Sequence, residues 1–207
     1  MEKGGLYSWC CAAYTTIVPL LFFITLSISK EGYDDYRRYK EEKLENRRET
    51  SVIRVVRDAN GTTTEWTTVK WSDIKVGDII KLDRDDWVPA DLVILHSEAE
   101  NGIAYIETMA LDGETNLKSR QALPCIAECC DTPERLAMCQ AEMVVEDPNL
   151  DLYNFEGKVL VGDVTKPLTN NQIVYRGSVL RNTPSMVGMV IFTGEESKIR
   201  MKYGFLP

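Results

Sequence analysis

Short runs of β-branched and aromatic residues, separated by turn residues, follow one another through most of the chain after Thr50 and limit its fold more than any other feature. "SVIRVVR" and "TTTEWTTVKW" flank "DANG", a pattern that predicts a β-hairpin. Gly, Pro, Asn or Asp separates the later runs, which read "VGDIIKL", "ADLVILH", "IAYIET", "QIVYRGSVLRN" and "SMVGMVIFT". Many short strands with turns between them predict a mainly β domain, either a sandwich or a roll.

Two segments in this β region have helical character instead. Between Leu123 and Asn149, the stretch "TPERLAMCQAEMVV" predicts a capped helix inserted among the strands. Near the end, Thr193 and Glu196 have the spacing of a capping box, which predicts a short helix through "GEESKIRM". The only histidine, His96, ends an apolar run, and we expect a structural or surface role for it.

The N-terminal part is of a different kind, because the run from Gly4 to Ser29 contains no charged residue. As a helix this run would span about 39 Å, more than the roughly 30 Å of bilayer hydrocarbon. A cleaved signal peptide fits less well, since Lys3 is the only basic residue before the run and no small-x-small cleavage site follows it. A buried soluble helix would need a polar face, which the run lacks. Residues 1–29 are therefore predicted to form a transmembrane helix, in which Pro19 is tolerated.

Residues 30–50 mix both signs of charge at helical spacing, with Asp34 and Arg38 one turn apart. This pattern predicts a charged stalk helix that continues the membrane helix. The positive-inside rule places everything after it in the cytosol, because this stretch is rich in basic residues, namely Lys30, Arg37, Arg38, Lys40, Lys43, Arg47 and Arg48.

Charge and cysteine usage exclude some functions. The net charge of -8 argues against nucleic acid as a partner. A zinc site built from Cys125, Cys129, Cys130 and Cys139 is disfavoured, because the spacing lacks a CxxC pair and His96 is distant. Reduced cytosolic thiols are the better interpretation, and no metal site is predicted.

The stretch "ALDGETNLKSR", residues 110–120, carries the candidate chemistry. Asp112 and Gly113 alone form an ordinary turn signal. Glu114, however, follows a glycine that lets the backbone approach another surface, and its carboxylate could orient or deprotonate a water. The chain contains no Ser-His-Asp set and no glycine-rich phosphate loop. If Glu114 is catalytic, its substrate must therefore be presented by something absent from this sequence. The alternative, a turn without catalytic function, stays open at this point.

Several blocks of sequence together resemble the actuator domain of type-IV P-type ATPases, the phospholipid flippases of eukaryotic membranes. The resemblance runs from about Tyr14 to about Met201. It is carried by "YTTIVPLLFF" before "KEGYDDYRRY", then by "VGDIIKL…WVPADLVIL", "YIETMALDGETNLK", "EDPNLDLYNFEGKV", "QIVYRGSVLRNT" and "GMVIFTGEESKI". The order of these blocks is more specific than any one of them. "DGETNLK" in particular is similar to the lipid-transporting branch, since ion pumps usually carry TGES there.

The resemblance implies a distorted jelly-roll-like actuator domain at 51–201. It further implies that residues 1–29 are the family's second membrane helix, that 30–50 form the stalk, and that 202–207 ("KYGFLP") are an atypical tail. Family members form an aspartyl-phosphate on a separate domain. The actuator loop then reaches this group, so the resemblance implies that Glu114 positions and activates the hydrolytic water. It also implies that Gly113 allows close approach, and that Asp112 and Thr115 hold the loop and contact the phosphate.

The chain lacks the DKTGT phosphorylation motif and a nucleotide-binding domain, so we expect an incomplete piece that hydrolyses no ATP alone. The complete enzyme would use ATP and Mg²⁺, whereas this piece would bind no cofactor. Its expected partners are the phosphorylation and nucleotide-binding domains, a phospholipid, the Golgi, endosomal or plasma membrane, and an accessory flippase subunit. Two alternatives stay open: a membrane-tethered β-domain that acts as a binding module, and the actuator of an ion-transporting P-type ATPase.

Overall fold

The computed structural model describes residues 5–58, 61–127, 130, 132, 135, 141–149, 151, 154–162 and 164–204. Side chains are described for these residues except at 5–16, 54–58, 61–64 and 202–204. The chain divides into two compact units, Met1–Arg47 and Arg48–Pro207.

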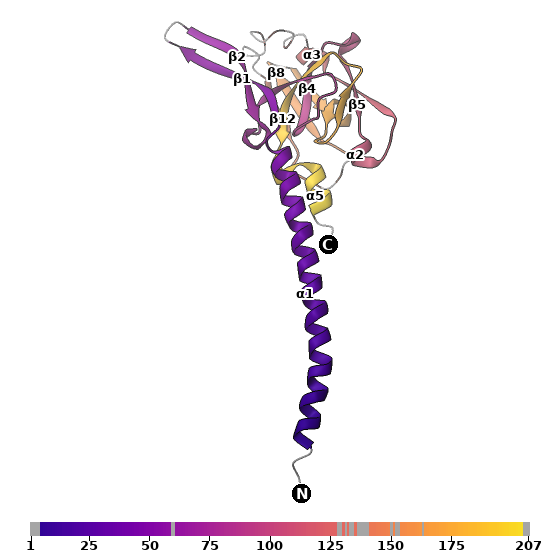
Figure 1. The fold of residues 1–207 in the computed structure, drawn as a ribbon. Coiled ribbons are helices and arrows are strands. Elements are labelled where there is room, and N and C mark those ends of the chain that lie inside the picture. Colours follow the sequence, from indigo (N-terminus) through magenta and orange to yellow (C-terminus); the bar gives the residue numbers. More distant parts are fainter. Residues whose placement is uncertain are drawn as a thin grey trace. The chain divides into compact units, whose positions relative to one another are not determined.

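The first unit is one long helix, α1 (Gly5–Glu45), which contains Pro19 and runs through both the predicted membrane segment and the predicted stalk (Figure 1). In the stalk part, Arg37 and Glu41 form an ion pair one turn apart, at 3.1 Å. The part of the predicted membrane segment before Ile17 lies outside the residues whose side chains are described. Among the described residues, no helix is both long enough and apolar enough to cross a membrane.

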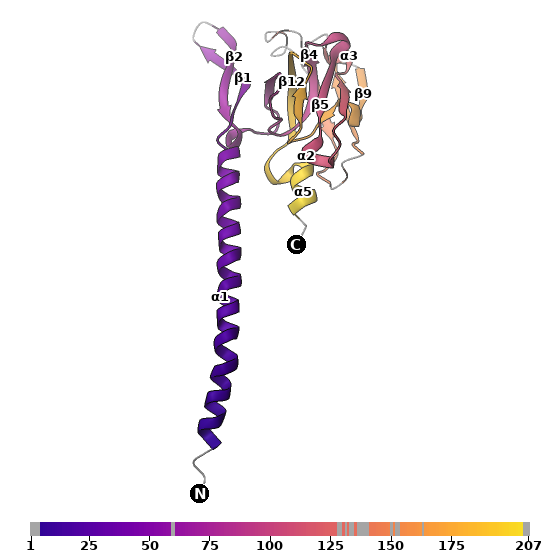
Figure 2. The same ribbon diagram turned by 45° about the vertical axis from the view of Figure 1, so that its right-hand side comes forward.

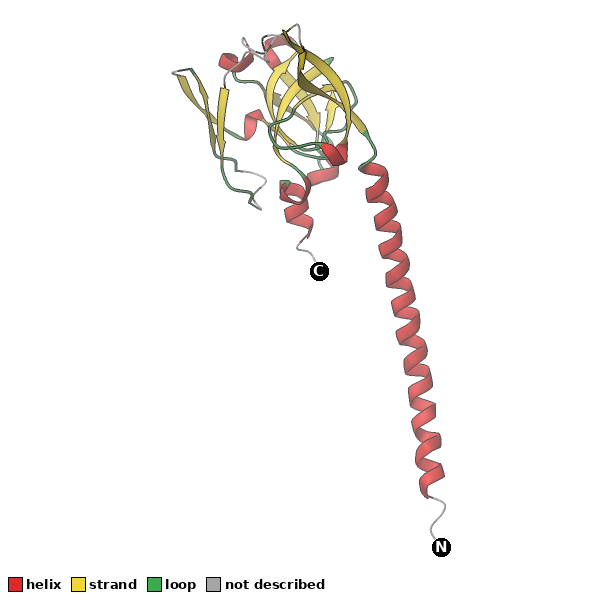
Figure 3. Ribbon diagram, turned by 90° about the vertical axis from the view of Figure 1, so that its left-hand side faces the viewer, coloured by secondary structure: helices red, strands yellow, loops and turns green. Residues whose placement is uncertain are grey.

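The second unit is built mainly from antiparallel strands, and its helices are short (Figure 3). Its largest sheet has the order β10-β4-β12-β3-β1-β2. These strands are β1 (Glu49–Asp58), β2 (Gly61–Lys70), β3 (Ile79–Asp83), β4 (Asp91–Ser97), β10 (Ile173–Val174) and β12 (Ser185–Phe192). The predicted hairpin is confirmed, since β1 pairs with β2 from Glu49 opposite Lys70 to Asp58 opposite Gly61.

Two three-stranded sheets complete the domain, with the orders β11-β5-β6 and β7-β8-β9. Their strands are β5 (Ile103–Glu107), β6 (Leu117–Gln121), β7 (Ala141–Val145), β8 (Gly157–Val161), β9 (Val164–Leu168) and β11 (Val179–Arg181). The helical elements are α2 (Met109–Asp112), α3 (Pro124–Ala127), α5 (Lys198–Gly204), and the 3₁₀ turns η1 (Trp71–Asp73), η2 (Glu100–Gly102), η3 (Asn170–Gln172) and η4 (Gly194–Glu196). The mainly β fold class is thus confirmed.

Strand β4 contributes residues to both apolar clusters of the domain core. Its residues alternate between two apolar clusters: Leu92 and Ile94 belong to one, and Val93 and Leu95 belong to the other. Because both faces of the strand are covered, its sequence is continuously apolar rather than alternating. The neighbouring β12 comes so close that a Cβ on Gly188 would lie 3.2 Å from the Cβ of Leu92. Glycine therefore lets the two strands approach closely at this position.

Helix α5 begins differently from the prediction. The capping box is wrong: Thr193 makes no side-chain cap, and Gly194–Glu196 form a 3₁₀ turn that ends before the helix. The amide of Lys198 instead donates to Oδ2 of Asp91 at 2.8 Å, and Oδ1 of the same carboxylate accepts the amide of Arg176 at 2.8 Å. A strand residue distant in sequence thus satisfies the first amide of the helix.

The side chain of Lys198 is fully buried and is surrounded by oxygen atoms. Its Nζ donates to Oε1 of Glu146 at 2.7 Å, to the carbonyl of Asp151 at 2.8 Å and to the carbonyl of Asn154 at 3.0 Å. The ammonium also lies 5.3 Å from the ring centre of Phe155. Lys198 therefore fastens the segment between β7 and β8 to the start of α5.

Two further predictions need correction. The segment predicted as an inserted helix ends in strand β7 (Ala141–Val145), and most of the rest lies outside the described residues. The run "QIVYRGSVLRN" is not one strand, because a turn at Gly177, with φ of 81°, separates β10 from β11. Strands β8 and β9 were not predicted individually. The tail beyond Gly204 lies outside the described residues.

Candidate functional site

The predicted loop lies between two paired strands. Strand β5 leads into it and β6 leads out, with Glu107 opposite Leu117 in an antiparallel register. Between the strands, Thr108 and Leu111 are buried, at 3% and 5% exposure. The short helix α2 thus anchors the loop to the domain, and the same end of the domain holds α5 (Figure 2). Leu111 and Ile199 both lie next to Gly177, which links the two helices.

Gly113 ends α2 in the left-handed conformation, with φ of 75° and ψ of 3°. Its amide donates to the carbonyl of Met109 at 3.0 Å. No atom lies within 4 Å of the position that a Cβ would occupy. The glycine is therefore required by its backbone angle rather than by crowding, and the open space agrees with the predicted access to another surface.

Asp112 holds the loop together. Its Oδ1 accepts the amide of Glu114 at 2.9 Å, and both of its oxygens lie within 3.1 Å of the hydroxyl of Thr108, which donates to them. Its Oδ2 accepts a hydrogen bond from Nζ of Lys118 at 2.5 Å. Burial alone would raise the pKa of Asp112, but the hydrogen bonds from Lys118, the Glu114 amide and Thr108 hold it below its usual value. Asp112 is thus an ionised carboxylate with a full set of donors.

Glu114 has a different environment. Its side chain is 58% exposed, and its Oε2 lies 3.1 Å from Nζ of Lys118. The backbone beneath it is fixed by Asp112 and Gly113, whereas the carboxylate faces solvent. An exposed base on a fixed backbone can meet a group on a second surface. Thr115 is exposed, and within the described part of the chain it makes no hydrogen bond that would hold the loop.

The structure therefore brings Asp112, Gly113 and Glu114 into one compact turn, and it adds a residue that the sequence analysis did not select. Lys118 lies on β6 opposite Ile106 and contacts both carboxylates of the loop. Its ammonium has a raised pKa, chiefly because of the hydrogen bond to Asp112. The signal in the sequence was the spacing of four residues between Glu114 and Lys118.

A small pocket of about 70 Å³ adjoins this turn and is lined by Thr108, Leu111, Asp112, Lys118, Arg120, Asn170 and Tyr175. Within the described residues, Nε of Arg120 is buried without a hydrogen-bond partner. Burial lowers the pKa of this guanidinium. The hydroxyl of Tyr175 donates to Oδ1 of Asn170 at 2.8 Å, and burial raises its pKa. The wall behind the loop thus combines a cation with buried polar groups.

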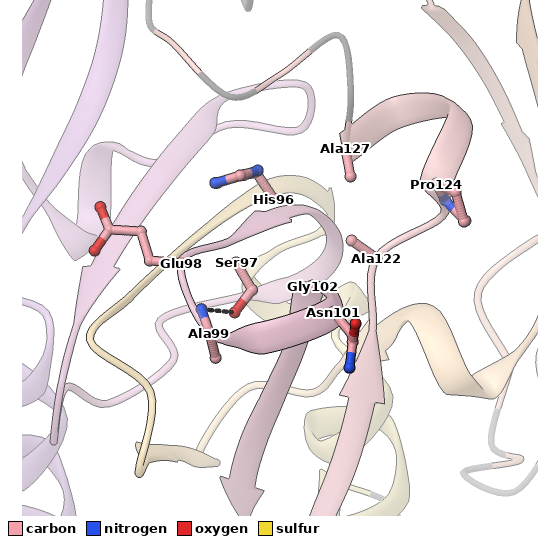
Figure 4. Close-up of a pocket in the computed structure, with 9 residues that line it drawn as sticks. All are labelled: His96, Ser97, Glu98, Ala99, Asn101, Gly102, Ala122, Pro124 and Ala127. Atoms are coloured by element: carbon pink, nitrogen blue, oxygen red, sulfur yellow. Dashed lines mark hydrogen bonds between the residues drawn. The ribbon is translucent and has the colours of Figure 1, made fainter.

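A larger pocket lies elsewhere in the described part of the chain. It has a volume of about 610 Å³, and Figure 4 shows its lining residues, which come from the end of β4, from η2 and from the segment Ala122 to Ala127. His96 and Ser97 lie at its edge, and none of its lining residues belongs to the Glu114 loop. The described residues contain no cluster of His, Cys, Asp and Glu suited to a metal ion. Cys129 and Cys139 lie outside the described residues.

Both the family model and the relatives that match this chain are of P-type ATPases. Residues 47–204 match the family model described as the P-type ATPase actuator domain. The chain is 37% identical to the probable phospholipid-transporting ATPase DNF3 of Saccharomyces cerevisiae, over 91% of this chain and 15% of the relative. It is 40% identical to the human phospholipid-transporting ATPase ID, over 92% of this chain and 15% of the relative. It is also 34% identical to the phospholipid-transporting ATPase dnf1 of Schizosaccharomyces pombe, over 91% of this chain and 18% of the relative. The chain therefore spans less than a fifth of the length of these relatives.

Proposed function

Because the chain belongs to the P-type ATPase actuator-domain family, we propose that it supplies the loop that hydrolyses an aspartyl-phosphate formed on another domain of a phospholipid-transporting enzyme. The observation that carries this proposal is the 58% exposure of the Glu114 side chain on a backbone fixed by its neighbours. A base that serves another domain must be both exposed and well placed. The names of the relatives favour a phospholipid over an ion as the transported substrate.

In the proposed step, Glu114 accepts a proton from a water molecule. The water oxygen forms a bond to phosphorus while the bond from phosphorus to the aspartyl oxygen breaks. The products are inorganic phosphate and a free aspartate carboxylate, and the proton resides on Glu114. General bases of this kind contribute about 10²–10⁴ in rate.

The other residues of the loop have supporting parts in this proposal. Asp112 fixes the turn through the Glu114 amide, and Gly113 leaves the surface free of a side chain. Thr115 is exposed beside Glu114 and would contact the phosphate region. The complete enzyme would bind ATP and Mg²⁺ on domains outside this chain.

The proposal includes a membrane location. Residues 1–29 would cross the membrane as the family's second helix, and 30–50 would transmit the movement of the cytosolic domain at 51–201. The membrane would be a Golgi, endosomal or plasma membrane, and an accessory subunit would bind the complete enzyme. The binding-module alternative would leave Glu114 without a role in any phosphoenzyme, so a kinetic experiment separates the two.

The experiment uses a full-length phospholipid-transporting relative in which residues 48–204 replace the native actuator domain. Glu114→Gln is expected to slow decay of the phosphoenzyme by about 10²–10⁴, so that the phosphorylated form accumulates. Glu142→Gln is the matched control, because Glu142 is an exposed glutamate on β7. Unchanged decay in the Glu114→Gln chimera would refute the proposed function.

A further inference from the structure

The ammonium of Lys118 lies between the two carboxylates of the loop. Its Nζ is 2.5 Å from Oδ2 of Asp112 and 3.1 Å from Oε2 of Glu114. The side chain of Lys118 is 29% exposed, that of Asp112 is 17% exposed and that of Glu114 is 58% exposed. The cation is thus half-sheltered, and the more exposed of its two partners is the proposed base.

The backbone of Lys118 is held more firmly than that of the loop. Lys118 is the second residue of β6 and stands opposite Ile106, which is buried at 0% exposure. Strand β5, which carries Ile106, also leads into the loop. Lys118 therefore occupies a fixed point from which it can set the position of a carboxylate on the neighbouring turn.

The two carboxylates that contact Lys118 differ in the other donors available to them. Asp112 receives hydrogen bonds from Thr108 and from the Glu114 amide as well as from Lys118. For the Glu114 carboxylate, Lys118 is the partner that the described residues provide. An ammonium has three N–H donors, so Lys118 can hold both carboxylates at once. The second oxygen of Glu114 then stays available to a water molecule.

The positive charge of Lys118 matters when the loop approaches the acyl phosphate. An acyl phosphate is an anion, and a loop that carried two uncompensated carboxylates would be repelled by it. Two like unit charges 4 Å apart repel by about 4 kcal/mol at an effective dielectric constant of 20. Lys118 reduces the net charge of the three side chains to that of one carboxylate. The nearby charged and titratable groups are Arg120 and Tyr175, which line the adjoining pocket with Asp112 and Lys118.

We propose that Lys118 is a positioning residue that holds the Glu114 carboxylate oriented toward the hydrolytic water and offsets the charge of the loop as it approaches the acyl phosphate. This inference rests on the proposed function. It assigns no contact between Lys118 and the phosphorus atom, because Lys118 acts through Glu114.

The test uses the same chimera of residues 48–204 in a full-length relative. Lys118→Met is expected to slow phosphoenzyme decay about 10–100-fold, as a misplaced reacting group does. Lys118→Arg is expected to restore most of the rate, and Lys118→Gln is expected to restore little, since it keeps a donor but no charge. Lys166→Met, at an exposed lysine on β9, is the control.

The outcomes are distinguishable. A domain that failed to fold would also slow phosphoenzyme decay. Rescue by Lys118→Arg, together with an unchanged thermal unfolding midpoint of the Lys118→Met chain, therefore marks loss of positioning rather than loss of the fold. If Glu114→Gln blocks decay but Lys118→Met and Lys118→Gln decay normally, the inference about Lys118 is wrong and the proposed function stands. If Glu114→Gln decays normally, the proposed function itself is wrong.

Discussion

Lys198 offers the most direct test of how this domain is held together. Lys198→Met keeps the length of the unbranched side chain, so it removes the charge without opening a large cavity. It leaves the Glu146 carboxylate and the carbonyls of Asp151 and Asn154 without the ammonium that they share. Removing one partner of a buried ion pair costs about 3–5 kcal/mol. The 20% exposure of the Glu146 side chain allows some hydration and favours the lower end of this range.

The expected loss is large enough to measure by thermal unfolding. About 2–4 °C per kcal/mol applies to a chain of this size, so a loss of about 3 kcal/mol is expected to lower the midpoint of Lys198→Met by about 6–12 °C. The assay is circular dichroism of the purified 207-residue chain in mild detergent, with urea unfolding as a second measurement. Lys166→Met is the matched control. As an exposed lysine, it is expected to change the free energy of unfolding by less than about 0.5 kcal/mol.

A second variant separates the lost ion pair from other effects of the change. Glu146→Gln added to Lys198→Met removes the buried charge that Lys198→Met leaves unpaired, and about 1–3 kcal/mol should return. If Lys198→Met lies within 1 kcal/mol of the unchanged chain, or if Glu146→Gln deepens its loss, the argument from the buried ammonium is refuted.

Two more predictions concern single positions. Gly113→Ala should cost about 1–2 kcal/mol of loop stability, because Gly113 has a left-handed φ of 75°, and Gly113→Asn should cost less. Hydrogen exchange of the Glu114 amide measures both losses. Equal protection of this amide in the unchanged chain and in both variants would contradict the argument. Burial, which outweighs the two backbone hydrogen bonds, raises the pKa of Asp91 to about 6. The folded pKa lies above the unfolded value of 3.8, so the stabilising contribution of Asp91 is present below about pH 4 and is lost as the pH rises through about 6, by about 3 kcal/mol. Urea unfolding of the unchanged chain and of Asp91→Asn between pH 4 and 7 measures this. The free energy of unfolding of the unchanged chain should fall relative to that of Asp91→Asn as the pH rises, and a relative increase would contradict the argument.

The strands that could be predicted are those whose signals are local. The hairpin from Glu49 to Lys70 combines β-branched residues with a turn sequence, and both operate within a few residues of one another. The start of α5 could not be predicted in this way. Thr193 and Glu196 have the sequence of a capping box, but the amide of Lys198 is satisfied by Asp91 on another strand. A partner distant in the chain overrides a local preference.

The same distinction applies to the candidate site. The turn at Asp112 and Gly113 is readable from two adjacent residues, because glycine alone accepts the left-handed angle without cost. The position of Lys118 depends instead on the register between β5 and β6, which places it opposite Ile106 and beside the turn. A register shift of one residue would move Lys118 to the other face of the sheet. The register between β5 and β6, which the sequence indicates only weakly, thus decides which cation contacts the two carboxylates of the loop.

The hydrogen bonds of the loop explain why Glu114 is better suited to chemistry than Asp112, although both are carboxylates on one turn. The carboxylate of Asp112 accepts hydrogen bonds from Thr108, from the Glu114 amide and from Lys118. A proton taken up by this carboxylate would weaken each of these hydrogen bonds. Glu114 holds no backbone group in the described structure, and its side chain is the more exposed of the two. It can therefore accept a proton and release it again while the turn keeps its shape. Under the proposed function, the domain repeats the same step in every cycle, and this requires that the residue that fixes the loop be separate from the residue that accepts the proton.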